Sequence, residues 1–117
     1  MSEMAVRIMG ETWTILEGTE EDYPGLTGAD GYTDTSTRTI VVADMKACEG
    51  ESDAKKNLQG YKKTVLRHEL IHAFLYESGL GANTGMVDSW AMNEEMVDWI
   101  AIQAPKIIKL FLELDLV

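Results

Sequence analysis

Two histidines and a glutamate lie close together in the chain, at a spacing that suits metal-assisted hydrolysis. His68, Glu69 and His72 form the motif His-Glu-x-x-His, which contains both histidines of the protein. On an α-helix, residues four apart lie on one face, so both imidazoles can reach the same ion. Zn²⁺ accepts such nitrogen ligands in a tetrahedral arrangement. Glu69 lies between them in angle, where it can take a proton from an attacking water and pass it on.

A catalytic zinc ion usually has three protein ligands, and no third histidine is present. Carboxylates are available downstream, where Glu94 and Asp98 lie four residues apart. We predict Glu94 as the third ligand and Glu95 as the alternative. Asp98 would accept the free ring N–H of a histidine ligand and hold its orientation, and Asn93 is expected next to the site as a supporting residue that does not bind the metal. The simpler interpretation is a chance motif on a helix surface, with Glu69 in solvent.

The motif requires a helix, and the apolar residues have helical spacing from about Gly60. Their stripe comprises Val65, Leu66, Leu70, Ala73 and Phe74, widened by Ile71 and Leu75. Gly79 is expected to end this helix as a left-handed glycine just beyond its last turn. The stripe is broad enough to predict that the helix is central in the fold.

The carboxylates require a second helix, which we expect from about Trp90 to Gln103. Asp88 or Ser89 would cap its N-terminus. Pro105 is expected to break or restart the helix, so a third helix is predicted from Lys106 to Leu116.

The first part of the chain has the alternating pattern of strands. Val6–Met9 and Thr12–Leu16 are predicted strands, joined by a two-residue turn at Gly10-Glu11. The strongest strand signal is Arg38–Ala43, because β-branched residues dominate it. The sequence therefore predicts one α+β domain over residues 1–117, mainly β over 1–45 and mainly α over 58–117.

Charge limits the classes of partner. Ten Lys and Arg against twenty Asp and Glu give a net charge of −10, which argues against nucleic acid or an anionic membrane as the main partner. The first 53 residues hold twelve acids and three bases, a balance of −9. One cysteine excludes an internal disulfide. No apolar run reaches the roughly 20 residues of a membrane span, and no signal peptide is recognisable, so a cytoplasmic protein is expected.

The two motifs together resemble a known family. His68-Glu69-x-x-His72 followed by Asn93-Glu94-x-x-x-Asp98 resembles the gluzincin branch of the zincin metallopeptidases, the thermolysin-like pattern. The resemblance implies that the two histidines and Glu94 bind Zn²⁺, that Glu69 is the general base and that Asp98 supports a histidine. It also implies a minimal zincin-like domain, in which about three strands pack on the active-site helix.

The whole chain also resembles short His-Glu-x-x-His proteins of Gram-positive bacteria and their prophages, through Gly31–Asp34, Thr39–Val42 and Asn93–Trp99. In zincins an edge strand before the active-site helix binds extended substrate by strand addition, and Arg38–Ala43 is the expected counterpart. Large gluzincins often supply a His or Tyr to the oxyanion from a C-terminal subdomain, and here no histidine follows the motif. Oxyanion stabilisation would have to come from a tyrosine, an arginine or backbone N–H groups. The candidate tyrosines, each with ordinary aromatic packing as the alternative, are Tyr32, Tyr61 and Tyr76.

Three functions stay open at this point. The first is a zinc-dependent metallopeptidase acting on a peptide or protein substrate. The second is a zinc-binding or regulatory module of zincin fold without peptidase activity, such as a phage or mobile-element protein. The third is a metal-free interaction protein. The last predicted helix also has more apolar residues than one packed face needs, so a homodimer through this helix is a further expectation.

Overall fold

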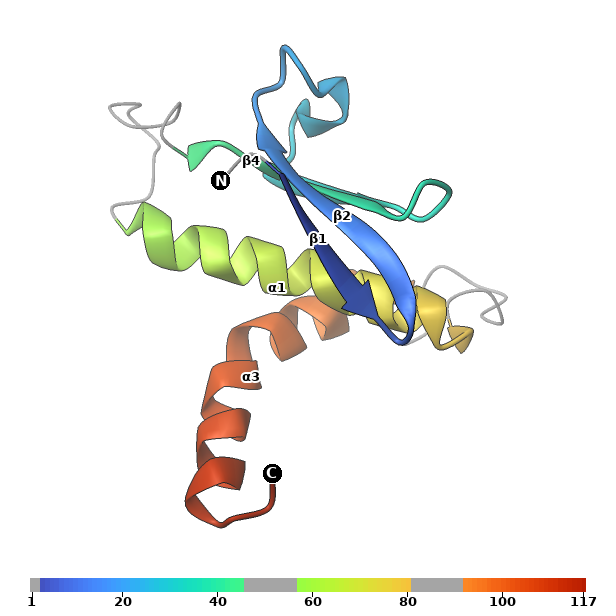
Figure 1. The fold of residues 1–117 in the computed structure, drawn as a ribbon. Coiled ribbons are helices and arrows are strands. Elements are labelled where there is room, and N and C mark those ends of the chain that lie inside the picture. Colours follow the sequence, from blue (N-terminus) through green and yellow to red (C-terminus); the bar gives the residue numbers. More distant parts are fainter. Residues whose placement is uncertain (1–2, 46–56, 81–91) are drawn as a thin grey trace.

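The computed structural model describes residues 3–45, 57–80 and 92–117, which form a mixed four-stranded sheet and two long helices (Figure 1). The elements are β1 (Glu3–Ile8), β2 (Glu11–Gly18), the 3₁₀ turn η1 (Pro24–Leu26), β3 (Gly31–Asp34), β4 (Thr39–Ala43), α1 (Leu58–Glu77) and α3 (Glu94–Glu113). The predicted α+β class is confirmed, with four strands in place of about three. Among the described residues, no helix has both the length and the apolar character needed to cross a membrane.

The strand order is β1-β2-β4-β3, so the two edges of the sheet are β1 and β3. β1 and β3 run antiparallel to their neighbours, whereas β2 and β4 pair in parallel. The expectation that residues 38–43 form an edge strand is therefore wrong. Three consecutive residues of β4, Ile40, Val41 and Val42, are at most 2% exposed, and such a continuous apolar run is typical of an internal strand covered on both faces.

The turn between β1 and β2 lies one residue earlier than predicted. Ile8 pairs with Glu11, so the two turn residues are Met9 and Gly10. Both have positive φ, 50° and 89°, as a type I′ hairpin requires. Glycine adopts this geometry without steric cost and is favoured at the second position, which explains the shift.

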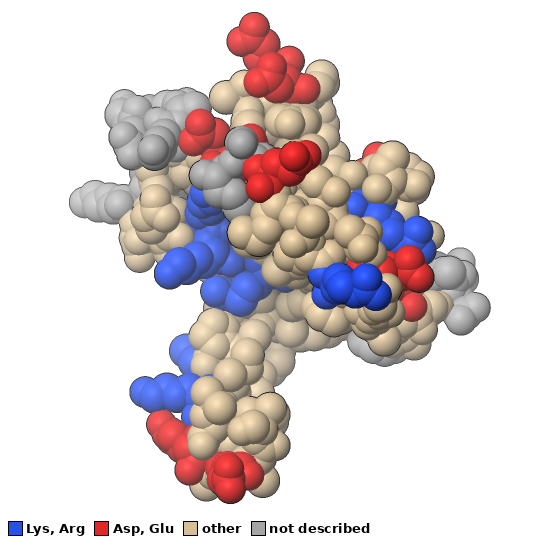
Figure 2. Space-filling model, viewed as in Figure 1, with Lys and Arg blue, Asp and Glu red and all other residues tan. Residues whose placement is uncertain are grey.

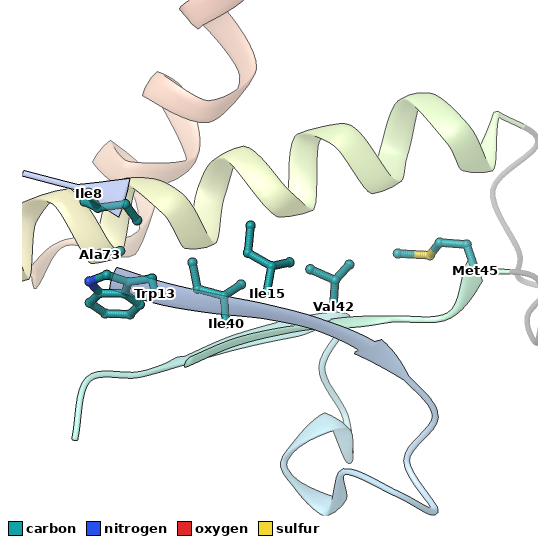
Figure 3. Packing of buried hydrophobic residues seen from close by; sticks show 7 residues of the cluster. All are labelled: Ile8, Trp13, Ile15, Ile40, Val42, Met45 and Ala73. Atoms are coloured by element: carbon teal, nitrogen blue, oxygen red, sulfur yellow. The ribbon is translucent and has the colours of Figure 1, made fainter. Parts of the chain in front are cut away.

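The core lies between the sheet and α1, which crosses one face of the sheet (Figure 1). Figure 3 shows its buried residues, which are Ile8, Trp13, Ile15, Ile40, Val42, Met45 and Ala73. Ala73 is fully buried, and its small side chain lets α1 approach the strands closely. α1 ends as predicted, because Gly79 has a φ of 85° and its N–H donates to the carbonyl of Tyr76.

α3 begins with a cap different from the expected ones. Asn93 is the N-cap, and its side chain accepts a hydrogen bond from the backbone N–H of Met96 at 2.9 Å. Asp88 and Ser89, the predicted caps, and Trp90, the predicted start, lie outside the described residues. The described helix begins at Glu94, which places two carboxylates in its first turn.

The predicted second and third helices are one helix, and Pro105 lies inside it. Proline has no N–H, so the carbonyl of Ala101 loses its usual partner four residues on. The Nε of Arg67 on α1 donates a hydrogen bond to this carbonyl. Figure 1 shows that α3 bends and that its second half projects away from the sheet. Pro105 therefore kinks α3 without ending it, because Arg67 satisfies the carbonyl that the kink exposes.

Candidate metal centre

His68 and His72 lie on one face of α1, as their spacing predicts. Their Nε2 atoms are 3.1 Å apart, and their rings meet edge to face with centroids 4.8 Å apart. The two side chains are 19% and 23% exposed, so both are largely enclosed while remaining reachable. α1 thus directs two imidazole nitrogens at one point.

Glu94 brings a carboxylate to the same point from the first turn of α3. Its Oε1 atom lies 3.0 Å from Nε2 of His68 and 2.8 Å from Nε2 of His72. These three atoms form a nearly equilateral triangle. In a tetrahedral zinc site with bonds of about 2.0–2.1 Å, neighbouring ligand atoms are about 3.3 Å apart. The spacing of the three atoms is therefore close to that of a zinc-binding set.

Asp98, one turn further along α3, contacts the other nitrogen of His68. Its Oδ1 atom lies 3.3 Å from Nδ1 of His68. With the proton on Nδ1, the Nε2 atom of His68 carries a lone pair that faces the carboxylate of Glu94 and the second imidazole. The same distances also suit hydrogen bonds in which a ring N–H of one histidine faces the carboxylate of Glu94. With both Nε2 atoms unprotonated, the donor set would fit Zn²⁺, and Asp98 would hold the tautomer of His68.

Glu69 lies next to this cluster and is 7% exposed, which is unusual for a carboxylate. The hydroxyl of Thr33 on β3 donates a hydrogen bond to its Oε1 atom at 2.8 Å and lies 3.2 Å from its backbone carbonyl. A Cβ atom at Gly31 would lie 2.9 Å from Val65 and 3.3 Å from Cγ of Glu69. The glycine is thus needed for β3 to approach α1 closely enough for Thr33 to reach the carboxylate.

A cleft of about 760 Å³ opens over these residues, between β3, α1 and the start of α3. It is lined by Gly31, Tyr32, Thr33, Thr35, His68, Glu69, His72, Leu75, Tyr76, Met92 and Glu94. Its size falls in the usual range of ligand-binding sites. One wall is an edge strand and the floor contains the candidate metal ligands, so an extended chain lying along β3 would pass over them.

The three candidate tyrosines are divided between two places. Tyr32 and Tyr76 line the cleft. Tyr61 instead donates a hydrogen bond from its hydroxyl to Asp30, and it lines a smaller neighbouring pocket of about 220 Å³ together with Asp98. Tyr76 also packs edge to face against Trp13 of the core. Tyr32 and Tyr76 therefore line the cleft itself, whereas Tyr61 lines an adjoining pocket that shares His68 and Glu69 with the cleft.

Two further residues predicted for the site, Glu95 and Asn93, lie next to the candidate metal ligands but do not belong to them. Glu95 is exposed, and of the two neighbouring glutamates it is Glu94 that meets the histidines. Asn93 caps α3 and so fixes the turn from which Glu94 projects. Among the His, Cys, Asp and Glu residues that the structure describes, the two histidines and Glu94 are the group that could hold a metal ion. Cys48 lies outside the described residues.

Sequence reasoning missed Thr33, because β3 was not predicted as a strand. Gly31–Asp34 has no alternation of apolar residues, and its four residues are half-buried. A turn signal was nevertheless available at Asp34, whose carboxylate accepts hydrogen bonds from the N–H and hydroxyl of Ser36. These bonds lower the pKa of Asp34. Such a turn before a strong strand is typical of a hairpin, which would have placed Thr33 on a strand.

No protein-family model matches this chain, and neither a curated protein nor a solved structure is similar to it. The argument for function therefore rests on the geometry of the site.

Proposed function

We propose that the chain is a zinc-dependent metallopeptidase. The observation that carries the proposal is the convergence of His68, His72 and Glu94 on one point, beside the buried carboxylate of Glu69. The four groups lie in one cleft whose wall is a strand edge. A cytoplasmic location is part of the proposal, since a chain with one cysteine does not depend on an internal disulfide.

Each residue has a distinct task in this proposal. Zn²⁺, when bound, lowers the pKa of water and polarises a carbonyl group. The two histidines and Glu94 hold the ion, and Asp98 keeps one imidazole in its ligating tautomer. Glu69 takes the proton of the attacking water and gives it to the leaving amine. Thr33 holds one oxygen of that carboxylate.

The substrate would be an extended peptide that adds to the sheet at β3. The outer side of this strand carries backbone N–H and C=O groups that no other strand of the described residues pairs. β3 also lines the cleft through Gly31, Tyr32 and Thr33. A peptide bound there lies beside Glu69, and Tyr32 and Tyr76 are the candidate tyrosines that line the cleft and could donate to its carbonyl oxygen.

The test combines metal analysis with a peptide-library assay of purified, untagged protein. The wild type is expected to hold one zinc per chain and to cleave peptides in a chelator-sensitive way. Glu69→Gln should keep the zinc and lose about 10²- to 10⁴-fold in rate, because only the proton carrier is removed. His72→Ala should lose the zinc, since two ligands do not hold it firmly. Glu69→Gln that cleaves as fast as the wild type would refute the mechanism.

A zinc-binding module without peptidase activity is the second candidate. It is favoured by the lining of the cleft, which offers no arginine and no further histidine to an oxyanion among the described residues. Stoichiometric zinc without chelator-sensitive cleavage of any peptide would establish this function in place of the first. Absence of zinc from wild-type protein would remove both and leave the metal-free interaction protein.

A further inference from the structure

A second, smaller pocket adjoins the cleft beside the start of β3. We define the acidic pocket as this space of about 220 Å³, which is bounded by Asp30, Tyr61, His68, Glu69 and Asp98. His68 and Glu69 line the larger cleft as well. A side chain that fills the acidic pocket therefore belongs to a residue that lies close to the candidate metal centre.

Two carboxylates of the acidic pocket are each held at one oxygen and keep the other for a ligand. Oδ2 of Asp30 accepts a hydrogen bond from the hydroxyl of Tyr61. Oδ1 of Asp98 lies 3.3 Å from Nδ1 of His68. In the described part of the chain, no group donates to the second oxygen of either carboxylate. Both groups are thus oriented in advance and can each accept a further hydrogen bond.

The buried carboxylate of Glu69 independently points to a bound group at this place. Glu69 is 7% exposed. Thr33 donates to its Oε1 atom, and Oε2 has no donor among the described residues. Because Glu69 is enclosed except where it lines the cleft and the acidic pocket, this oxygen is satisfied only by a group that enters one of them.

The chain supplies no cation of its own to these carboxylates. Neither lysine nor arginine is among the described residues that line the pocket. Figure 2 shows that the basic side chains on the viewed face gather mainly over the first half of α1, below the sheet. Of these α1 residues, Lys62 forms an ion pair with Glu17, and Arg67 donates to the carbonyl of Ala101.

A bound Zn²⁺ would leave the acidic pocket negative. Its two positive charges would be matched by the carboxylates of Glu69 and Glu94. Asp30 and Asp98 would then still contribute two negative charges, which favour a cationic group in the pocket and disfavour an anionic one. Val65 also lines the pocket, so the apolar stem of a long basic side chain has a surface to lie on.

The position of Asp30 indicates which residue of a bound peptide would reach the pocket. Asp30 directly precedes β3, and its backbone carbonyl accepts a hydrogen bond from the N–H of Ala43 at 2.8 Å, so the sheet holds it in place. The cleft extends along β3 to Thr35 at the other end. A peptide that adds antiparallel to β3, as β4 already does, runs from Thr35 towards Asp30. Its C-terminal half therefore lies at the acidic pocket.

We propose that the acidic pocket binds the side chain of a lysine or arginine that directly follows the scissile bond, with Asp30 as the residue that determines this specificity. The inference rests on the proposed peptidase function for the existence of a scissile bond. The binding preference of the pocket is measurable without turnover.

Peptide binding to zinc-loaded Glu69→Gln protein tests the pocket. The probes are capped, fluorescently labelled hexapeptides that differ at one position, which is Lys, Leu or Glu, and fluorescence anisotropy gives Kd. At 0.5 M salt the screening length is about 4 Å, so the general attraction of an acidic protein for cations is suppressed. We expect the Lys peptide to bind about tenfold more tightly than the Leu peptide, and the Glu peptide to bind most weakly.

Asp30→Asn, made in the same background, keeps the shape of the side chain and removes its charge. It should reduce the preference for Lys over Leu to about twofold or less. Asp22→Asn is the matched control, because it changes the net charge equally in an exposed loop outside the pocket, and it should leave the preference unchanged. Circular dichroism and zinc content check that both variants are folded and loaded.

Mapping the cleavage products of the wild type separates this inference from the proposed function. Lys or Arg directly after the cleaved bond supports both. Cleavage with Lys and Leu peptides of equal Kd, or with the preference before the cleaved bond, would overturn the inference and leave the peptidase. Lys-selective binding that Asp30→Asn abolishes, without cleavage of any peptide, would support the pocket and refute the peptidase. No binding of the Lys peptide at about 1 mM would overturn the inference.

Discussion

Thr33 links the candidate general base, Glu69, to the sheet through a hydrogen bond. A buried carboxylate without a hydrogen-bond donor is costly, and Glu69 is almost fully buried. The hydroxyl of Thr33 satisfies one oxygen of this carboxylate at 2.8 Å. With that oxygen held, the other is restricted in the directions it can face. Thr33 is therefore a positioning residue that acts through Glu69.

For the proposed peptidase, removing this hydroxyl should impair hydrolysis without removing zinc. We expect Thr33→Val to lower kcat about 10- to 100-fold with little change in KM, because a carboxylate that loses its donor is no longer held in one orientation. Zinc content should stay at one per chain. Thr33→Ser should retain most activity.

Thr39→Val is the matched control for this prediction. Its hydroxyl bonds only within the neighbouring turn, to Thr37, and it lies on the adjacent strand. It should leave kcat and KM unchanged. If Thr33→Val lost its activity together with its zinc or its folded structure, the hydroxyl would have a purely structural role.

At the scale of elements, hydrogen bonds to Glu77 connect the end of α1 to the sheet. Its Oε1 atom accepts hydrogen bonds from Nε1 of Trp13 at 2.8 Å and from Nε of Arg38 at 2.6 Å. The Arg38 hydrogen bond is the main cause of a lowered pKa of Glu77 and outweighs the opposing effect of burial. The same contact raises the pKa of Arg38. The carboxylate thus links α1 to β2 and to the end of the turn before β4.

The stability from this link should depend on pH in a defined direction. A lowered folded-state pKa means that the contribution is present above the ordinary value of 4.5 and is lost as pH falls through the folded-state value. Glu77→Gln should therefore lower Tm at pH 7, and its difference from the wild type should shrink below about pH 4.5. Thermal melts at several pH values measure this. Glu21→Gln changes an exposed loop residue, and its Tm difference from the wild type should not depend on pH in this way. A Tm difference between Glu77→Gln and the wild type that stays constant with pH would contradict the prediction.

At the scale of the whole molecule, the distribution of charge should select among peptides. The protein carries a net charge of −10, and zinc would cancel two units. The described lining of the cleft includes the carboxylates of Glu69 and Glu94 and no lysine or arginine. A field of this sign attracts cations and repels anions, most strongly at low ionic strength.

For the proposed peptidase we accordingly expect matched Lys-rich peptides to be cleaved with a kcat/KM about three- to tenfold higher than that of Glu-rich peptides at low salt. The ratio should fall toward one as salt is raised, because screening shortens the range of the field. The measurement is competitive cleavage of two peptides with the same central residues. Equal rates at low salt would show that charge plays no part in selection.

Much of the fold and most of the candidate site could be predicted because they depend on local spacing. Helical periodicity identified α1, and a four-residue spacing is enough to put His68 and His72 on one face. The β-branched run of β4 and the glycine that ends α1 were also local signals. The α+β class followed from these elements alone.

The features of the fold and the site that the sequence did not predict depend on contacts between distant segments. β3 is a strand because it pairs with β4, and only that pairing brings Thr33 to Glu69. α3 continues through Pro105 because Arg67, 38 positions earlier in the chain, satisfies a freed carbonyl. Helical spacing ranked Glu94 above Glu95 as the third ligand, and the crossing of α3 over α1 is what brings the Glu94 carboxylate to the histidines. Local sequence determines which conformations and ligands are available, whereas tertiary packing decides which groups meet, because the free energy of those contacts depends on the arrangement of the whole fold.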